Sequence, residues 1–402
     1  MKNIKIYLPL LCLLLACGEH KKEKSAAAAT EESQDVSSPT SGKLTNKELK
    51  RYHNNAKGFF DSGLIRRGFN GSVLVAKNGV PVLEEYVGFT DPSSRKDSIK
   101  VDDAFHLASV SKTFTAMGVL KLWQEGRLQL EDDLSKFFSD FPYQGITVKM
   151  LLNHRSGLPN YVHYFEKYRW DPNKYVSNLD VLSSLYTMHP PLQFPSGKRF
   201  AYCNTNYALL ALIIEKVSGL KYASYLNLTF FKPLQMKNTF VFSMSDTARA
   251  LPSYEWNNKE FRLEYLDLVY GDKNVYSTVR DMLKWDQALY AGRFFSQSTL
   301  DSAFSPYSFE KRGKRNYGLG WRMTLLDNGK KLLYHNGWWH GNNTVFIRLV
   351  DENATIIVLG NKFNRKIYSA KKLCDLFGPY EQSAPDEEGE FDSSHPALGG
   401  SK

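Results

Sequence analysis

Two residues in the first third of the chain could supply the nucleophile and the base of an acyl-transfer reaction. Ser109 and Lys112 stand three apart, and apolar residues then recur every three or four positions as far as Trp123, which predicts a helix with one apolar face beginning near Ser109. On that helix the two side chains lie one turn apart, where a neutral amine can take the hydroxyl proton. Free N–H groups at the helix start suit a developing oxyanion. Taken alone, a capping serine and a surface lysine are the commoner explanation.

A second pair, Tyr202 and Asn204, could assist such a nucleophile. A tyrosine hydroxyl can relay a proton, and an asparagine amide can orient both a lysine and a substrate carbonyl. The structural alternative is a core tyrosine followed by an asparagine that caps the next helix. The pair in isolation carries no information about function.

A third group, His335, Gly337 and Trp338, follows a candidate strand. The histidine could hydrogen-bond to the tyrosine–lysine pair or to a substrate, and the glycine would let a substrate lie close along the strand edge. The N–H of Trp338 could complete an oxyanion hole with that of Ser109. A His-Gly turn with aromatic residues in the core is the alternative, and for this group alone it is the better one.

The elements that must position these residues are strands at both ends of the folded part and helices between. Five runs have the composition of strands, and Asn78-Gly79 between the first two is a strong hairpin signal. The runs are Gly71–Lys77, Val80–Val87, Lys331–His335, Thr344–Val350 and Ala354–Leu359. Helical spacing dominates from about 110 to 290, for example over Leu209–Val217 and Val279–Leu289. The pattern predicts an α+β fold, with an antiparallel sheet from both termini, flanking helices and a mostly helical insertion at roughly 135–270.

Composition excludes several classes of protein. The chain has 402 residues, of which 42% are hydrophobic, so it can bury a sizeable core and is neither wholly disordered nor fibrous. Four cysteines are too few for a disulfide scaffold, and we expect Cys203 and Cys374 to be buried free thiols. The net charge of +10 raises the question of anionic partners, but no zinc-finger spacing, RNP-type motif or P-loop accompanies it, so nucleic acid is not an expected partner.

The N-terminus reads as a targeting signal. Lys2 and Lys5 precede an apolar run, Ile6–Leu15, which is too short to span a bilayer as a mature helix. The run ends at Cys17 in a sequence that resembles a lipobox, and this resemblance implies cleavage before Cys17 and lipid attachment to its thiol. Ordinary secretion is the alternative. With no Asp at position 18, we expect a lipoprotein of the cell envelope on the outer membrane, facing the periplasm or the surface, with the leaflet open.

The folded part is flanked by two segments that cannot pack a core. Residues 18–43 are rich in Ala, Ser, Lys and Glu and read as a tether. Residues 380–402 hold a cluster of acids among Ser, Pro and Gly and read as a disordered acidic tail. The predicted organisation is therefore a signal peptide at 1–17, the tether, a catalytic domain at 44–379 and the tail. The folded part is more basic than the whole chain, which suits anionic envelope material or simply a solvated surface.

Taken in order, Ser-x-x-Lys, Tyr-x-Asn and His-x-Gly resemble the motifs of the penicillin-recognising serine hydrolases, in particular the class C β-lactamase-related family with its D-alanyl-D-alanine carboxypeptidases, D-aminopeptidases and esterases. Supporting segments also resemble the family's. They are Leu151–Pro159, Pro195–Gly197, Tyr276–Thr278 with Asp281 and Trp285, and Tyr317–Trp321, which resembles the strand before the third motif. The likeness covers about 55 to 375 and implies the β-lactamase and penicillin-binding transpeptidase fold.

The resemblance also implies a role for each motif residue. Ser109 would be the acylated nucleophile, Lys112 the general base and Tyr202 the proton relay; which of the last two takes the first proton is open, since coupled groups can share it. Asn204 would orient the substrate, His335 and Gly337 would form the wall of the site, and the N–H groups of Ser109 and Trp338 would form the oxyanion hole. No metal or other cofactor is implied.

Two departures from the family pattern bear on specificity. His335 stands where many relatives carry a lysine, and a largely neutral histidine is a weaker partner for a substrate carboxylate, so strong β-lactam turnover is less expected. Trp338 and Trp339 stand where small residues are usual; they could narrow the cleft, stack on an apolar acyl group or point into the core. The aromatic segment Tyr161–Tyr175 could edge the site as a substrate lip or pack into the core.

The preferred hypothesis is a serine hydrolase that cleaves an ester or amide, such as a D-amino-acid peptide from the cell wall, through an acyl-enzyme on Ser109. Its partners would be a small-molecule or peptide substrate and the membrane, through the lipid on Cys17; the oligomeric state is open. The alternatives are a catalytically silent envelope binding or regulatory protein on the same fold, and a basic surface-binding protein whose binding would be salt-sensitive.

Overall fold

A computed structural model describes residues 42–290, 294–310 and 313–381. The predicted signal peptide with Cys17, nearly all of the tether and nearly all of the tail lie outside the described residues, so those assignments remain predictions. Within the described ranges, no helix is both long and apolar enough to cross a membrane.

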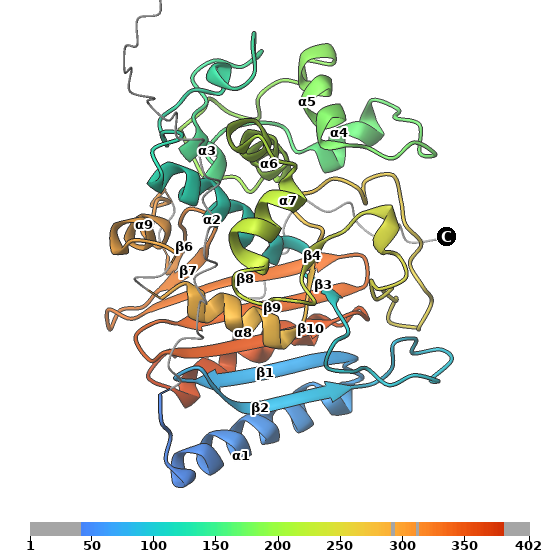
Figure 1. Ribbon diagram of the computed structural model, residues 1–402, viewed down its shortest axis with the longest axis vertical. Coiled ribbons are helices and arrows are strands. Elements are labelled where there is room, and N and C mark those ends of the chain that lie inside the picture. Colours follow the sequence, from blue (N-terminus) through green and yellow to red (C-terminus); the bar gives the residue numbers. More distant parts are fainter. Residues whose placement is uncertain (1–41, 291–293, 311–312, 382–402) are drawn as a thin grey trace, which may run out of the picture. The chain divides into compact units, whose positions relative to one another are not determined.

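A seven-stranded antiparallel sheet is built from both ends of the described chain, as the sequence predicts (Figure 1). The strands are β1 (Gly71–Lys77), β2 (Val80–Val87), β6 (Arg315–Tyr317), β7 (Arg322–Leu325), β8 (Lys331–Trp339), β9 (Asn342–Leu349) and β10 (Ala354–Gly360). Their order is β2-β1-β10-β9-β8-β7-β6, so the N-terminal hairpin pairs with the last strand. Asn78 and Gly79 turn the hairpin with φ values of 54° and 72°, which explains why these two residue types stand there.

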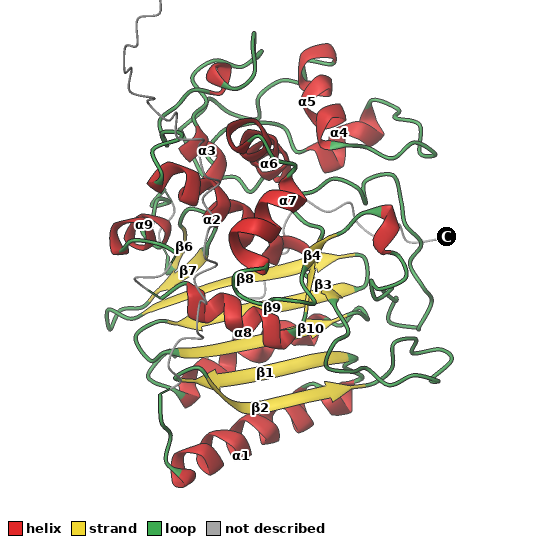
Figure 2. Cartoon of the chain, viewed as in Figure 1, coloured by secondary structure: helices red, strands yellow, loops and turns green. Residues whose placement is uncertain are grey.

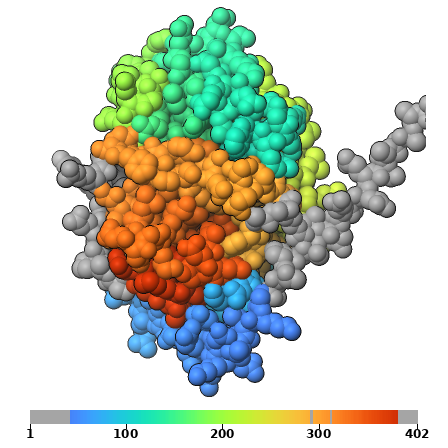
Figure 3. Space-filling view, turned by 90° about the vertical axis from the view of Figure 1, so that its left-hand side faces the viewer, coloured from blue at the N-terminus to red at the C-terminus, as the bar shows by residue number. Residues whose placement is uncertain are grey.

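Helices cover both faces of the sheet (Figure 2). The α-helices are α1 (Asn46–Gly63), α2 (Ser111–Gln124), α3 (Val148–Leu152), α4 (Tyr161–Lys167), α5 (Asn178–Thr187), α6 (Asn204–Ser218), α7 (Tyr222–Leu226), α8 (Val279–Ala288) and α9 (Gln297–Ala303). The other helical segments are the 3₁₀ helices η1 (Ile65–Arg67), η2 (Ala108–Val110), η3 (Leu134–Lys136), η5 (Met244–Asp246) and η6 (Arg365–Leu376) and the π-helix η4 (Asn227–Phe231). On the face seen in Figure 3, the residues around 100–200 gather at one end and the C-terminal, sheet-forming residues lie beneath them.

The alternation of side chains along each strand separates two apolar cores. Leu74 of β1 and Ile357 of β10 belong to the core that contains α2, α6 and α8. Val73 and Val75, their neighbours on β1, belong to the core that contains α1 and η6. Because both faces are buried, the strands read in the sequence as nearly continuous apolar runs.

The helix that follows Ser109 differs from its prediction. The spacing of apolar residues indicates a helix with one apolar face, but every residue of α2 from Ser111 to Leu120 is buried. The physical reason is that α2 packs against α6 and α9, while its Phe114 stacks on Trp285 of α8 with ring centres 4.4 Å apart. Polar residues on this helix are therefore held in the interior, which is where a catalytic lysine would be needed.

Three further details correct the sequence-based expectations. A small sheet, β3-β5-β4, lies within the region expected to be helical; its strands are β3 (Phe105–His106), β4 (Phe240–Val241) and β5 (Val275–Ser277). Strand β8 extends past His335 because its last residues still pair with the start of β9. Of Tyr317–Trp321, expected as a strand, only the first residue belongs to β6, and the rest forms the turn to β7, with Gly320 at φ 88°.

Cys203 and Cys374 are buried free thiols, as expected.

Candidate active site

Ser109 lies on a tight turn that presents it from an otherwise buried segment. Residues 104–108 and 110–120 are all buried, whereas Ser109 is partly exposed. Ala108 has φ 49°, a left-handed conformation that costs a non-glycine residue about 1–2 kcal/mol. The N–H of Ala108 donates to Nδ1 of His106 (3.1 Å), and Nε2 of His106 donates to Oδ1 of Asn274 (2.9 Å). Burial lowers the pKa of His106 to about 4, so it stays neutral and keeps the acceptor that holds the turn.

Lys112 reaches back from α2 to Ser109. Its side chain is fully buried, and Nζ lies 3.1 Å from Oγ of Ser109. Nζ also donates to the carbonyl oxygen of Asp272 at 2.8 Å. The structure therefore brings together the two groups that the Ser-x-x-Lys spacing pairs, at a distance that permits proton transfer.

Tyr202 and Asn204 approach this pair from the start of α6. The ring centre of Tyr202 lies 4.9 Å from Nζ of Lys112, and its hydroxyl is buried. Asn204 is the first residue of α6, and its buried Oδ1 has no hydrogen-bond partner among the described residues. A buried acceptor without a partner costs about 1–3 kcal/mol, and a substrate N–H could satisfy it.

His335 lies behind the site rather than on its surface. It is fully buried, its ring centre is 6.3 Å from that of Tyr202, and its Nε2 accepts from the hydroxyl of Tyr317 at 3.3 Å. Burial, and then the charges of Arg322 and Lys112, hold the pKa of His335 well below its usual value, so the ring is neutral. The expectation that this side chain forms the wall of the site is corrected: His335 supports the wall from behind.

Gly337 allows β8 to contact the turn that carries Ser109. A Cβ at this position would clash with the carbonyl oxygen of Leu107 and with Oγ1 of Thr344, and it would lie 3.0 Å from Cβ of Ala108. Oγ1 of Thr344 itself donates to the carbonyl of Leu107 at 2.8 Å. The space on that side of the glycine is thus taken by the protein's own turn. Gly337 also lines the cleft, so the expectation that a substrate lies close along this strand stays a prediction.

The two tryptophans after Gly337 have different environments. Trp338 is partly exposed and lines the cleft, with Nε1 donating to the carbonyl of His340 at 3.0 Å. Trp339 is buried, and its Nε1 donates to Oδ1 of Asp267 at 2.6 Å. Strand β7 pairs with β8 only over Lys331–Tyr334, so β7 does not cover the edge of β8 beyond that point, where a substrate could align.

A cleft of about 710 Å³ passes over these elements. Its lining includes Ser109, Tyr202, Gly337 and Trp338. Of the other expected site residues, Lys112, Asn204 and His335 are buried behind that surface. The aromatic segment Tyr161–Tyr175 contributes nothing to the lining, and Tyr161, Tyr164 and Phe165 are packed in the core.

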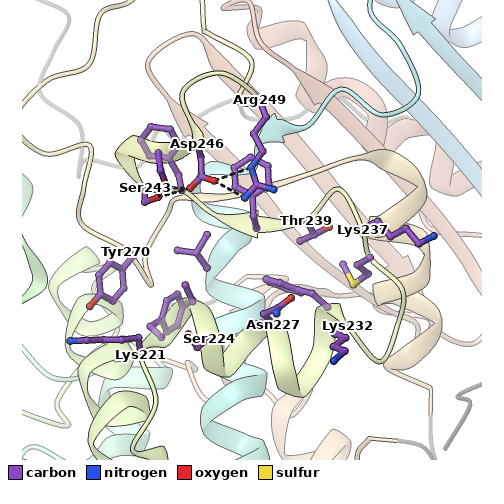
Figure 4. Close-up of a pocket in the computed structure, with 18 of the residues that line it drawn as sticks. Lys221, Ser224, Asn227, Lys232, Lys237, Thr239, Ser243, Asp246, Arg249 and Tyr270 are labelled. Atoms are coloured by element: carbon purple, nitrogen blue, oxygen red, sulfur yellow. Dashed lines mark hydrogen bonds and ion pairs between the residues drawn. The ribbon is translucent and has the colours of Figure 1, made fainter. Parts of the chain in front are cut away.

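A larger cavity of about 830 Å³ lies elsewhere, between α7, η4 and the loop around β4 (Figure 4). None of the expected site residues lines it. Its polar centre is an ion pair between Arg249 and Asp246, 2.6 Å apart, and Asp246 also accepts from the hydroxyl of Ser243. Glu215, Lys221, Lys232 and Lys237 also line the cavity, and none of these described lysines is hydrogen-bonded to a lining hydroxyl as Lys112 is to Ser109.

One carboxylate–histidine cluster could not be predicted from spacing. Glu264, Asp267 and His340 place one ligand atom each within 4.8 Å of one another, an arrangement that could hold a cation. Nε2 of His340 lies 2.9 Å from Oδ1 of Asp267. Burial opposes the charge on both groups, but their mutual attraction and hydrogen bonds outweigh it, so the pKa of His340 is raised and that of Asp267 is lowered.

Sequence reasoning missed three residues that contact the site. They are Asp272, whose carbonyl binds Lys112, Tyr317, which donates to His335, and Arg322, whose guanidinium carbon lies 4.9 Å over the ring centre of Tyr202. A backbone carbonyl leaves no signal in a sequence. Arg322, however, directly follows the segment that ends at Trp321, so its adjacency to a family-like segment could have drawn attention to it.

A family model, characterised sequences and solved structures all match this chain to the same family of proteins. The family model described as Beta-lactamase matches residues 59–371. Among characterised sequences, the chain is 33% identical over 332 residues to Penicillin-binding protein 4* of Bacillus subtilis (strain 168), covering 79% of this chain and 73% of that protein.

Solved structures agree. The D-amino acid amidase from Ochrobactrum anthropi SV3, complexed with L-phenylalanine amide, is 25% identical, with a TM-score of 0.64 over 80% of this chain and 96% of the amidase. The penicillin binding protein from Bacillus halodurans has a TM-score of 0.68 over 83% of this chain and 99% of its own; at 23% identity it supports the fold alone.

Proposed function

This chain belongs to the β-lactamase family of serine hydrolases, and on that premise we propose that it cleaves an ester or amide through an acyl-enzyme on Ser109. The observation that carries the proposal is the 3.1 Å approach of Nζ of the buried Lys112 to Oγ of the partly exposed Ser109, on the surface of a cleft. A D-amino-acid amide or peptide is a reasonable substrate class, because a D-amino acid amidase shares the fold at 25% identity.

The proposed reaction begins with transfer of the Ser109 proton to Lys112 as Oγ attacks the substrate carbonyl. The carbonyl of Asp272 accepts one N–H of the lysine, which directs the nitrogen lone pair toward the serine. The N–H groups of Ser109 and Trp338 would receive the oxyanion, because Gly337 lets β8 pack directly against the Ser109 turn.

Collapse of the tetrahedral intermediate expels the amine or alcohol, which takes a proton from Lys112 or Tyr202, and leaves an ester on Ser109. Water then attacks this ester, and the same pair accepts the water's proton. The bond between the acyl carbon and Oγ of Ser109 breaks, the acid is released, and the proton passes to Oγ. Trp338 lines the cleft and would limit the bulk of the substrate groups that fit beside it.

The N-terminal lipid belongs to the same proposal. We propose that the mature chain begins at a lipidated Cys17, so that the enzyme works at a membrane of the cell envelope. Labelling cells with an alkyne-tagged fatty acid, with Cys17→Ser as the control, tests this separately from activity. Label on the variant would overturn it.

The decisive experiment is mass spectrometry of the acid-quenched protein after reaction with an activated ester and, separately, with a penicillin. We expect a mass increase that maps to Ser109 and is absent from Ser109→Ala. The reagent that labels would separate esterase-like from penicillin-recognising behaviour.

If neither reagent gives an adduct and neither is turned over, the proposal is wrong. The alternative would then be an envelope binding protein on the same fold, with a cleft closed to acyl donors by Trp338.

A further inference from the structure

The cleft at Ser109 has a lining of one charge sign. Of the 20 described residues that line it, seven are Arg or Lys, and none is Asp or Glu. They are Arg67 of η1, Arg315 and Arg322 of the β6–β7 hairpin, and Arg365, Lys366, Lys371 and Lys372 of η6. The chain as a whole has 52 basic against 42 acidic residues, so an unbiased lining would contain both signs.

The charges come from three segments that are remote in sequence but meet around one space. On η6, the apolar residues Ile367, Ala370 and Leu373 are buried in the core with α1, while the basic residues between them line the cleft. Helix η6 thus has an apolar side that fixes it to the sheet and a basic side that faces the cleft.

The other cavity shows that this uniformity is local. Its lining also contains several basic residues, but Glu215 and Asp246 accompany them, and Asp246 pairs with Arg249. A basic protein therefore does not produce an all-cationic cavity by default. The described lining of the Ser109 cleft contains no Asp or Glu that corresponds to Asp246, so all of its formally charged side chains are cations.

Arg322 is the cation of this lining that contacts a residue of the candidate active site. Arg322 is half-buried, and its guanidinium lies over the ring of Tyr202, at 4.9 Å from the ring centre. Its charge also reaches His335, which it helps to keep neutral. The positive lining therefore includes cations on the exposed side of η6 as well as the arginine beside Tyr202, so that a ligand with several anionic groups could contact more than one of them.

We propose that the natural substrate is polyanionic: beside the ester or amide that Ser109 attacks, it carries two or more phosphate or carboxylate groups that the cations of this cleft bind. The inference rests on the proposed function and specifies its substrate class. Guanidinium and ammonium groups bind both kinds of anion through charge-assisted hydrogen bonds, so either chemistry fits.

One rival occupant belongs to the chain itself. The described structure ends at Glu381, which lies 3.4 Å from Lys314, the residue before Arg315 of the lining. The segment 382–402 that follows contains Asp386, Glu387, Glu388, Glu390 and Asp392. A tethered acidic segment would have a high effective concentration at the cleft, so the experiment must separate it from a substrate.

The test compares matched substrates on the full chain. Three aryl esters of one acid are used, with a neutral ring, a ring bearing two phosphates and a ring bearing two carboxylates. We expect kcat/KM to be about tenfold or more higher for at least one anionic ester than for the neutral one. The preference should weaken between about 50 and 500 mM salt, because salt screens exposed charges.

Charge reversal then identifies the cations responsible. Lys366→Glu with Lys372→Glu should lower the anionic-to-neutral ratio of kcat/KM by about tenfold or more, since both side chains are exposed and close to the path of the anions. Lys232→Glu with Lys237→Glu in the larger cavity makes the same change in net charge and should leave the ratio within about twofold.

A binding measurement separates this inference from the proposed function. Calorimetry with inorganic tripolyphosphate on Ser109→Ala should show binding that the Lys366/Lys372 reversal weakens and the control does not. An unchanged substrate ratio together with unchanged binding overturns the polyanionic substrate, while Ser109-dependent turnover of the neutral ester would still support the hydrolase. No turnover of any ester, with specific tripolyphosphate binding intact, would instead overturn the hydrolase and with it the substrate, and would leave a cleft that binds polyanions.

The tail is tested in the same chain by replacing its five clustered acids with amides. If the effect of the Lys366/Lys372 reversal on the ratio disappears in that background, the cations serve the tail and the substrate proposal is wrong. If the effect persists, the cations act on the substrate.

Discussion

Two histidines five residues apart, His335 in strand β8 and His340 in the turn that directly follows it, lie in opposite electrostatic environments. On one side, which we call the catalytic side after the proposed nucleophile Ser109 and base Lys112, His335 is buried beside Arg322, and its pKa is held well below the usual value. On the acidic side, defined by Glu264, Asp267 and His340, the pKa of His340 is raised. The residue type is the same, and the difference comes entirely from neighbours that other elements supply.

The two sides also differ in what they stabilise. On the catalytic side the buried polar groups are close to a cleft, and some of them, such as Oδ1 of Asn204, have no partner among the described residues. On the acidic side Asp267 accepts hydrogen bonds from Trp339 and His340 and is nearly inaccessible. We therefore expect changes on the catalytic side to remove activity and changes on the acidic side to remove stability.

The largest expected effect is that of Lys112→Met on turnover. The change keeps most of the side-chain volume but removes the amine beside Ser109, so kcat/KM on an ester should fall by about 10³-fold or more. Lys121→Met, farther along the same helix and partly exposed, is the matched control and should change kcat/KM little. Thermal melts of both proteins show whether they fold. Retention of more than a tenth of the activity by a folded Lys112→Met protein would remove Lys112 from the mechanism.

A smaller effect is expected where the catalytic side meets the sheet. Gly337→Ala places a methyl group against the carbonyl of Leu107 and Oγ1 of Thr344, so β8 and the Ser109 turn must separate. We expect a loss of about 1–3 kcal/mol in unfolding free energy and of about 10²-fold in kcat/KM, because a small displacement misplaces the nucleophile.

Gly58→Ala provides the comparison for Gly337→Ala. A Cβ at Gly58, in the middle of α1, meets no atom within 4 Å. That substitution should stabilise the protein by about 0.5–1 kcal/mol without affecting kcat/KM. A Gly337→Ala protein that behaves like Gly58→Ala would show that β8 can move away from the turn at no cost.

On the acidic side, Asp267→Asn should lower stability and leave turnover nearly unchanged. The change removes the charge that His340 pairs with and weakens the acceptor of Trp339 Nε1, so we expect a loss of about 2–3 kcal/mol in unfolding free energy. Turnover by the folded fraction should stay within about threefold. Glu264→Gln, at the exposed edge of the same cluster, should cost less than about 0.5 kcal/mol. A large loss of kcat/KM with unchanged stability in Asp267→Asn would assign the acidic side to catalysis.

Features that depend on local sequence could be predicted, whereas those that depend on distant neighbours could not. The hairpin at Asn78-Gly79, the late strands and the sheet built from both ends follow from local patterns, because turn chemistry and apolar alternation are local. The three motifs could be read because each is a short run of residues. The Ser109–Lys112 contact in particular follows from helix geometry alone.

What could not be read depends on which distant residues become neighbours. The lowered pKa of His335 requires burial and the charges of Arg322 and Lys112, and the raised pKa of His340 requires Asp267, more than seventy residues earlier in the chain. The close approach of the Leu107 backbone to Gly337 likewise depends on a segment remote in the sequence. Strands β3, β4 and β5 have only two or three residues each, so their sequences contain no alternating pattern long enough to predict a strand.

The smallest expected effect is a difference in pH dependence between His340→Gln and His335→Gln. Because the folded pKa of His340 is raised, its contribution to stability is full below the unfolded value of 6.5 and is lost as the pH rises through the folded pKa. The stability advantage of the wild-type protein over His340→Gln should therefore be larger at pH 6 than at pH 9.

The contribution of His335 to stability changes with pH in the opposite direction. Its folded pKa is lowered, so below pH 6.5 the unfolded chain binds a proton that the folded protein excludes, and stability falls as the pH falls. The advantage of the wild-type protein over His335→Gln should thus shrink from pH 7.5 to pH 5, by at most about 1.4 kcal/mol per pH unit. Denaturant titrations of the three proteins at each pH provide the measurement, and the slopes due to the other buried histidines, His106 and His154, cancel in the differences. Parallel curves for the two variants would show that the two sides of β8 do not hold their histidines in different charge states.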